Sequence, residues 1–181
     1  MSIRILGLSI MLIVAACSVL AQESVAEPDM ADVFYRLDTG KLVPLERQAT
    51  AYKGGAHGFV VMKMKMGATL PGGKSPVRFK AGEPLEFVVK SLLSGAYSDQ
   101  AALYFLRQLE AKKNQRELTT TKGTFTPIGG SATTAPLAGV LPVEFAHYGT
   151  GSLLVKTAGL RPGEYAIGRN YGPFAFCFGV D

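Results

Sequence analysis

A strict alternation runs through Phe174-Ala175-Phe176-Cys177-Phe178-Gly179-Val180-Asp181, with bulky apolar side chains at every second position and smaller ones between them. This period of two is typical of a β-strand, because successive side chains point to opposite faces. Burial of one phenylalanine side chain contributes about 1.5–3 kcal/mol. Three phenylalanines on one face therefore predict a strand that anchors a core.

A second strand is predicted just before this one. Pro162-Gly163 is typical of a turn, because proline presets φ and glycine accepts a positive φ. Residues 164–167 then alternate, with Tyr165 and Ile167 on one face. The break at residues 169–173 returns the chain. The two segments together predict the closing hairpin of a β-sandwich.

Short strands joined by turns are predicted along the rest of the chain. Pro44 indicates that the strand at residues 42–45 lies at a sheet edge. At 181 residues, with 21 glycines and 10 prolines, the chain fits one all-β domain. The other predicted strands are residues 33–37, 59–66, 76–80, 85–90, 143–147 and 152–156.

Three further segments have a less regular pattern than these strands. Residues 100–113 fit either a helix or a strand, and we favour the strand because the neighbouring segments are strands. Residues 54–58 predict a loop. Residues 122–139, which are rich in Gly, Ser, Thr, Pro and Ala, predict a long surface loop or a local insertion.

The N-terminal residues 1–21 have the pattern of a signal peptide. Arg4 precedes an apolar run that is too short to span a bilayer, and Val19-Leu20-Ala21 fits a cleavage site. Val14-Ala15-Ala16-Cys17 also resembles the bacterial lipobox, in which the cysteine is lipidated. We therefore expect a periplasmic or secreted protein, or alternatively a membrane-anchored lipoprotein carrying its lipid on Cys17. Residues 22–32 predict a flexible tether and residues 33–181 the β-sandwich domain.

The cysteine count excludes an internal disulfide. Cys17 and Cys177 are the two cysteines, and the mature chain keeps either one thiol or one thiol and a lipidated residue. Cys177 lies among phenylalanines, which predicts a shielded, unreactive thiol.

The formal charge of the chain is +5. A location in the cell envelope or outside the cell argues against nucleic acid as a partner. The charge suits anionic membrane or glycan surroundings, and equally serves solubility alone.

Methionines form the sharpest candidate for chemistry. Met62, Met64 and Met66 alternate with Lys63 and Lys65 on a predicted half-buried strand. Thioether ligands select Cu(I), so the triplet could form a copper site, with His57 close in sequence. The alternative is that this methionine face fills the core.

Catalytic motifs are missing from the sequence. It contains no HExxH, Walker or GxSxG pattern, and neither His57 nor His147 has a second ligand at zinc spacing. A triad can be assembled on paper from Ser152, His147 and Asp99, as in many chains of this size. The carboxylates of Asp38, Glu46, Glu83 and Glu86 are expected to be solvated surface charges.

Two resemblances add to this interpretation. Leu160-Arg161-Pro162-Gly163-Glu164-Tyr165 resembles the corner motif of immunoglobulin-like sandwiches, in which a tyrosine hydroxyl bonds back to nearby backbone. Prealbumin-like and carboxypeptidase-regulatory-like sandwiches carry a similar signature. Most of the mature chain also resembles a group of uncharacterised bacterial secreted proteins. The matching segments are residues 35–38, 42–46, 75–85 and 177–181.

These resemblances imply an all-β, immunoglobulin-like (Greek-key) β-sandwich after an N-terminal signal peptide, with no known activity. We expect a non-catalytic binding or structural module without a cofactor. Its partner would be an unknown protein or another envelope component, and membrane contact would come only through a lipid on Cys17. The alternative is a periplasmic copper-binding protein that uses Met62, Met64 and Met66.

Overall fold

The computed structural model describes residues 26–92, 101–134, 139–169 and 172–181. The predicted signal peptide with Cys17, and the first part of the predicted tether, lie outside the described residues. The elements named in the described part are all strands. They are β1 (Phe34–Asp38), β2 (Lys41–Pro44), β3 (Glu46–Ala49), β4 (Ala51–His57), β5 (Met62–Pro71), β6 (Arg78–Phe79), β7 (Leu85–Lys90), β8 (Tyr104–Ala111), β9 (Gln115–Thr126), β10 (Gly129–Thr134), β11 (Val140–Leu141), β12 (Glu144–Tyr148), β13 (Ser152–Thr157), β14 (Gly163–Arg169) and β15 (Phe174–Val180).

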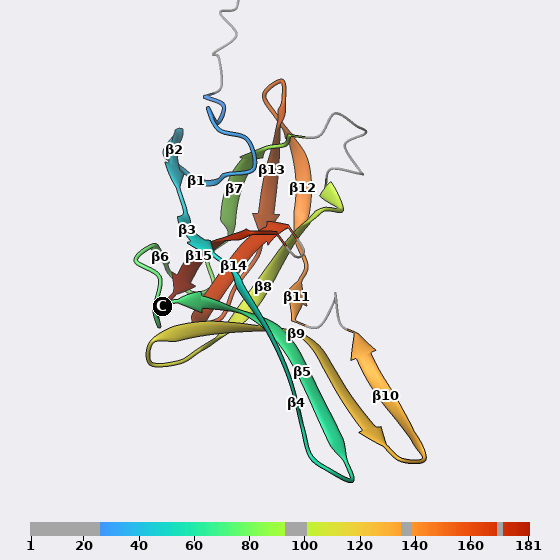
Figure 1. Ribbon diagram of the computed structural model, residues 1–181. Helices are drawn as coiled ribbons and strands as arrows, with labels where there is room; N and C mark the ends of the chain where they lie inside the picture. Colours follow the sequence, from blue (N-terminus) through green and yellow to red (C-terminus); the bar gives the residue numbers. More distant parts are fainter. Residues whose placement is uncertain (1–25, 93–100, 135–138, 170–171) are drawn as a thin grey trace, which may run out of the picture.

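The strands form two sheets. The five-stranded sheet has the order β12-β13-β7-β1-β2, and the ten-stranded sheet follows the path β3-β15-β14-β8-β9-β5-β4, with β6, β10 and β11 paired beside it. Half of the larger sheet packs face to face on the smaller one, while β4, β5, β9 and β10 extend away from this body (Figure 1). The chain is therefore an all-β, immunoglobulin-like sandwich, as predicted, whereas the Greek-key connectivity stays a prediction.

The main core lies between the two sheets. Phe34 and Phe87 from the smaller sheet meet Phe176 and Phe178 of β15, with ring centroids 5.5 Å apart for Phe34–Phe176 and 5.0 Å for Phe87–Phe178. All four rings are buried. The predicted anchoring role of this face is confirmed for Phe176, Phe178 and Val180. It is wrong for Phe174, which is 39% exposed at the start of the strand, with the Arg47 guanidinium over its ring.

The predicted closing hairpin is also confirmed. β14 pairs antiparallel with β15 in the register Tyr165↔Phe178. The Tyr165 hydroxyl donates a hydrogen bond of 2.7 Å to the carbonyl oxygen of Arg161, which is the corner contact that the resemblance implied. On the other face of this sheet, Ala166 and Cys177 join a smaller core with Leu70 and Leu109.

Several local predictions can be compared with the strands. Within residues 100–113, the described part contains β8, so the strand was the correct choice. β2 lies at the end of its sheet, which confirms the edge position predicted from Pro44. Two loop predictions are wrong. Residues 54–57 belong to β4, and residues 122–134 belong to the β9–β10 hairpin, while residues 135–138 lie outside the described part.

Both loop predictions failed for one physical reason. Glycine and small polar residues weaken strands by propensity, but an exposed strand can be held by pairing to a neighbour, without a buried side-chain row. β4 and β10 are such strands, since neither shows an alternation of large apolar residues. Backbone pairing to β5 and β9 defines them instead.

Residues of the predicted tether contact the sandwich. The Glu27 carboxylate accepts hydrogen bonds from the Thr150 backbone N–H and from the hydroxyls of Thr150 and Ser152, the last at 3.0 Å. These bonds hold the pKa of Glu27 below its ordinary value, with the backbone bond from Thr150 as the largest cause. The Asp32 backbone N–H donates to the carbonyl oxygen of Lys90 at 2.7 Å.

Candidate functional site

Two β-hairpins project from the sandwich side by side. We call residues 51–69 and 121–134 the arm; they comprise β4 and β10 with the adjoining parts of β5 and β9. β4 pairs with β5 as far as His57↔Lys63, and β9 pairs with β10 as far as Thr126↔Gly129. β5 and β9 join the two hairpins in the register Met62↔Phe125, so that both turns lie at the same end of the arm (Figure 1).

The arm requires glycine at two positions where one backbone segment approaches another closely. Gly58 has φ +110°, and a Cβ there would lie 2.0 Å from the Val61 carbonyl oxygen, so the β4–β5 turn requires glycine. At the base, the β5–β9 register shifts between Met66 and Gly67. A Cβ on Gly67 would lie 2.2 Å from the Leu118 carbonyl oxygen, which identifies this bulge as a second site where only glycine fits.

One face of β5 passes from buried to exposed as the strand leaves the body. Leu70 and Ala68 are each only 1% exposed and close the smaller core, whereas Met66 is 46% and Met62 45% exposed. Cross-strand partners share a face, so Ala56 and Phe125 lie beside these methionines. We call this row of Ala56, Met62, Met64, Met66 and Phe125 the apolar face.

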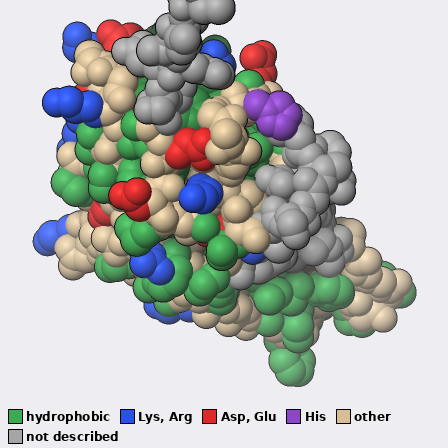
Figure 2. All heavy atoms as spheres, turned by 90° about the horizontal axis from the view of Figure 1, so that it is seen from above, with side chains coloured by type: hydrophobic (Ala, Val, Ile, Leu, Met, Phe, Trp, Pro, Cys, Tyr) green, Lys and Arg blue, Asp and Glu red, His purple; other side chains and the backbone are tan. Residues whose placement is uncertain are grey.

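The free end of the arm is apolar as well. Phe59 and Ile128 are fully exposed, and Val60 is largely so. We call this end the apolar tip, and its exposed apolar residues are Phe59, Val60, Val61, Met62, Phe125 and Ile128. Green side chains gather over the projecting part at the lower right of the space-filling view (Figure 2). Contiguous exposed apolar side chains on a protein surface mark an interaction site more often than isolated ones do.

The opposite face of the arm carries positive charge. Lys53, His57, Lys63 and Lys65 fall on it by alternation, and no aspartate or glutamate occurs in residues 51–69 or 121–134. At the base, the ammonium group of Lys65 lies 3.5 Å from the carboxylate of Glu117, which also binds Lys112 at 2.6 Å. The hydrogen bond from Lys112 lowers the pKa of Glu117. We call this side the basic face.

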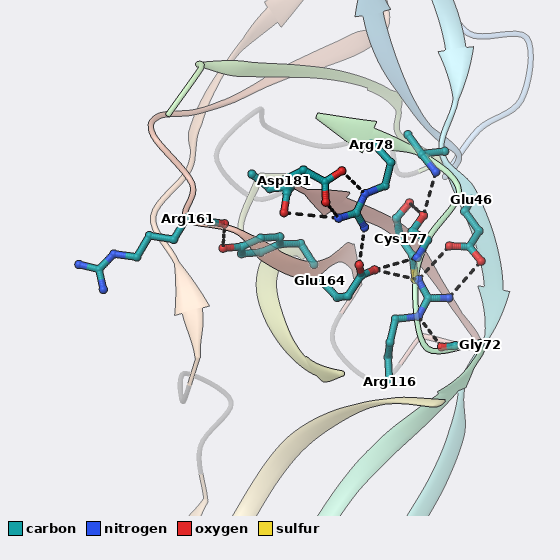
Figure 3. A network of polar contacts seen from close by, with 12 residues as sticks. Glu46, Gly72, Arg78, Arg116, Arg161, Glu164, Cys177 and Asp181 are labelled. Atoms are coloured by element: carbon teal, nitrogen blue, oxygen red, sulfur yellow. Dashed lines mark hydrogen bonds and ion pairs between the residues drawn. The ribbon is translucent and has the colours of Figure 1, made fainter. Parts of the chain in front are cut away.

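A buried ionic network attaches the arm to the sandwich (Figure 3). Arg116 of β9 is fully buried and pairs with both oxygens of Glu46 on β3, at 2.9 and 3.0 Å. Its guanidinium also donates to the carbonyl oxygens of Pro71, at 2.9 Å, and Gly72, at 3.0 Å. One side chain of β9 therefore bonds the end of β5, where that strand returns from the arm, and the edge strand β3 of the body.

The network continues to the end of the chain. Glu164 of β14 lies 3.7 Å from Arg116, accepts the Ser75 backbone N–H at 2.8 Å, and pairs with Arg78. Arg78 in turn binds Asp181, with its Nε 2.9 Å from the carboxylate. We call Glu46, Arg78, Arg116, Glu164 and Asp181 the clamp. Its chemistry is structural, because each charge already has an opposite charge beside it.

The pKa shifts in the clamp follow its pairing. Burial acts to raise the pKa of Glu46, but hydrogen bonds from Arg116, Ser75 and Gln48 outweigh it, and the pKa lies below the ordinary value. The Asp181 pKa is lowered by its hydrogen bond from Arg78. Burial raises the pKa of the neighbouring Cys177 to about 12, in agreement with the predicted unreactive thiol.

The methionine triplet lies on the arm and does not fill the core. That alternative was wrong for Met62 and Met66, which are nearly half exposed, whereas Met64 between them is half-buried. His57 pairs with Lys63 and so lies on the basic face, opposite the thioethers. The described residues contain no group of three or more His, Cys, Asp or Glu side chains placed to hold a metal ion.

Two residues of the triad assembled on paper, Ser152 and His147, lie in the described part of the chain. The Ser152 hydroxyl donates to Glu27, His147 lies on β12 opposite Leu153, and Asp99 is outside the described residues. An open hollow of about 630 Å³ lies between β13 and the tyrosine corner. Its lining includes Gln108, Glu144, Lys156, Thr157, Arg161 and Tyr165.

Sequence reasoning missed the apolar tip and the clamp. The tip had a signal in the run Phe59-Val60-Val61-Met62, which directly follows a glycine and precedes an alternating strand. The lack of acidic residues over residues 51–69 was a second signal. Glu46 was expected to be a solvated charge, and this was wrong, because its side chain is only 13% exposed and pairs with Arg116. No local pattern indicates a partner 70 residues away.

In the part of the chain that the structure describes, no helix is long and apolar enough to cross a membrane. No protein-family model, curated protein or solved structure matches the chain.

Proposed function

We propose that the protein is a secreted or envelope-associated, non-catalytic binding module whose contact element is the arm. The observation that carries the proposal is the uncovered apolar surface of the arm, which is continuous with the smaller core at its base. The clamp supports the same interpretation, because it fixes β9 and the end of β5 where the arm leaves the body. A rigid base lets two small hairpins present a defined surface.

Binding is tested by co-sedimentation with isolated bacterial envelopes. The triple variant Phe59→Ser, Val60→Ser, Ile128→Ser should lose most binding, because these side chains are exposed and serve no packing role in the free protein. Met30→Ser with Leu92→Ser is the matched control, since both residues are exposed and apolar but lie outside the arm. Equal binding by the triple variant and the wild type would refute the role of the arm.

The proposed cellular location is tested separately, by measuring the intact mass of the mature protein. A chain that begins at Gln22 indicates simple secretion, whereas a diacylated Cys17 indicates the lipoprotein. A mature protein that retains residues 1–21 would refute both addresses. The non-catalytic proposal would fail if a hydrolase screen found turnover that disappears in His147→Ala.

Copper binding is a second candidate, favoured by the exposure of Met62 and Met66 on one face. Thioether sulfurs two residues apart on a strand point the same way, and their flexible side chains can converge on one soft cation. Cu(I) titration of the wild type against Met62→Leu, Met64→Leu, Met66→Leu tests it. Leucine keeps the apolar surface and removes the sulfurs, so unchanged Cu(I) affinity would exclude this function.

A further inference from the structure

We propose that the partner of the arm is a lipid bilayer with anionic headgroups, and that the apolar tip enters its interface. This inference rests on the proposed function, because it names the partner of the same arm. It differs from the lipoprotein address, since the contact is made by side chains of the fold and needs no lipid on Cys17.

The shape of the tip favours a fluid partner. The tip consists of two adjacent turns, residues 58–61 and 127–128, and the side chains of Phe59 and Ile128 are fully exposed there. A protein partner would need a deep pocket for such a convex projection. Lipid chains close around a projection of any shape, so a bilayer covers all of these side chains at once.

The charge distribution favours an anionic surface. Residues 51–69 and 121–134 contain Lys53, Lys63, Lys65 and Lys122 and no acidic residue. The chain has 19 basic and 14 acidic residues, so the remainder has 15 basic against 14 acidic and is nearly neutral. The arm therefore holds almost all of the net charge of the protein. Clustered lysines beside an apolar element are typical of binding to anionic lipids.

The order of the residues along the arm matches the layers of a membrane interface. The row nearest the turns is apolar, with Met62 opposite Phe125, and the first lysine, Lys63, follows one residue later. Strands rise about 3.3 Å per residue, and lysine side chains extend their ammonium groups toward water. The apolar tip can thus reach the acyl boundary while the ammonium group of Lys63 lies among the headgroups. Lys53, which pairs with Gly67, lies farther from the tip, on the water side of the headgroups. The insertion is shallow, about 5–10 Å, and does not span the bilayer.

Tryptophan fluorescence gives a direct test, because the chain has no tryptophan. Phe59→Trp places a single probe at the tip, and Leu92→Trp places one at an exposed apolar position outside the arm. Both variants are secreted with Cys17→Ser, so that no lipid on that residue contributes. With vesicles of phosphatidylcholine and phosphatidylglycerol, the emission of Phe59→Trp should shift to the blue and be quenched by brominated acyl chains. The emission of Leu92→Trp should not change.

Vesicle flotation then separates the apolar and ionic contributions. Phe59→Ser with Ile128→Ser should lower partitioning by about tenfold or more. Lys53→Gln with Lys63→Gln should lower it on anionic vesicles and reduce its dependence on salt. The matched control is Lys41→Gln with Lys80→Gln, which removes two exposed charges outside the arm and should change partitioning little.

Several outcomes would overturn the inference. Equal binding to pure phosphatidylcholine would remove the ionic part of the argument. Envelope binding without vesicle binding would identify a protein or glycan partner and leave the proposed function standing. Tip-dependent self-association in sedimentation, without vesicle binding, would identify a second copy of the chain as the partner. If the wild-type protein bound neither envelopes nor vesicles, the proposed function itself would be refuted.

Discussion

At the scale of single residues, Arg116 has an unusual position for a charged side chain. It is fully buried, and its guanidinium is bonded to Glu46 and to two carbonyl oxygens, with Glu164 also nearby. Burying an ion is costly unless opposite charge and hydrogen bonds surround it. Arg116 meets this condition through strands far apart in the sequence. Its removal would leave two poorly solvated carboxylates.

Arg116→Met is therefore expected to destabilise the protein by about 3–5 kcal/mol, the usual cost of breaking a buried pair. The free energy of unfolding is measured in urea. Lys156→Met is the control, because Lys156 pairs with Glu86 at 2.9 Å on the surface, where a pair contributes about 0.2–1 kcal/mol. Adding Glu46→Gln to Arg116→Met should recover part of the loss. Equal costs for Arg116→Met and Lys156→Met would show that the clamp contributes no more than a surface pair.

Glu46 gives the clamp a dependence on pH. Its folded-state pKa lies below the ordinary value of 4.5, so the unfolded chain binds its proton more tightly than the folded chain does. The stabilisation is complete above about pH 4.5 and is lost as the pH falls through the folded-state pKa. The difference in unfolding free energy between wild type and Glu46→Gln should thus shrink in acid. Comparison with this variant is needed because Glu27, Glu117 and Asp181 also have lowered pKa values.

Urea unfolding of the two proteins between neutral pH and about pH 3 makes this measurement. A difference that stays constant over that range would mean that the Glu46 carboxylate is not the group responsible.

At the scale of elements, the strands with a buried face could be predicted and the strands without one could not. In β15, large and small side chains alternate because Phe176 and Phe178 enter the core, so the buried face can be recognised from the sequence. β4 contains Gly54-Gly55 and exposes every residue. Apart from the Tyr52 hydroxyl, which donates to the carbonyl oxygen of Gly172, backbone pairing to β5 defines it. Backbone hydrogen bonds do not select side chains, so such a strand resembles a loop in sequence.

The same contrast separates the two parts of the candidate site. The alternation of Met62 to Met66 predicted a strand correctly, but the pattern cannot say whether an opposing layer exists. That depends on where the bulge at Gly67 directs the strand. The clamp was unpredictable for a different reason: its charges meet only after β3, β9 and β14 have been brought together by the fold.

Stability should differ sharply between the base and the tip of one hairpin. Leu70→Ala removes a buried side chain from the smaller core and should cost about 2–5 kcal/mol. Phe59→Ser and Ile128→Ser remove side chains that contact only solvent and should each stay within about 0.5 kcal/mol of the wild type. Urea unfolding of the three variants measures the contrast. A loss of several kcal/mol for Phe59→Ser would show that the tip packs against the body in solution.

At the scale of the whole molecule, the protein combines a cooperative body with an arm that lacks a core of its own. The body closes around the core between the two sheets, and the arm is joined to it through the smaller core and the clamp. Local opening is cheapest where few apolar contacts are buried and the backbone bonds are exposed to water. The arm has both properties outward from the bulge at Gly67.

Hydrogen exchange should therefore show two levels of protection. Amides of β7, β14 and β15 should exchange only through global unfolding, whereas amides of β4 and of residues 62–66 should exchange through a local opening of lower free energy. Cys177 supplies an independent probe of the body, because it is the one thiol of a chain that begins at Gln22 and burial raises its pKa to about 12. Its reaction with a thiol reagent should follow the global free energy and should accelerate in Arg116→Met. Phe59→Ser should leave the labelling rate unchanged. If the amides of the arm exchanged as slowly as those of β15, or if Cys177 reacted as fast as the arm opens, the body and the arm would have to be one cooperative unit.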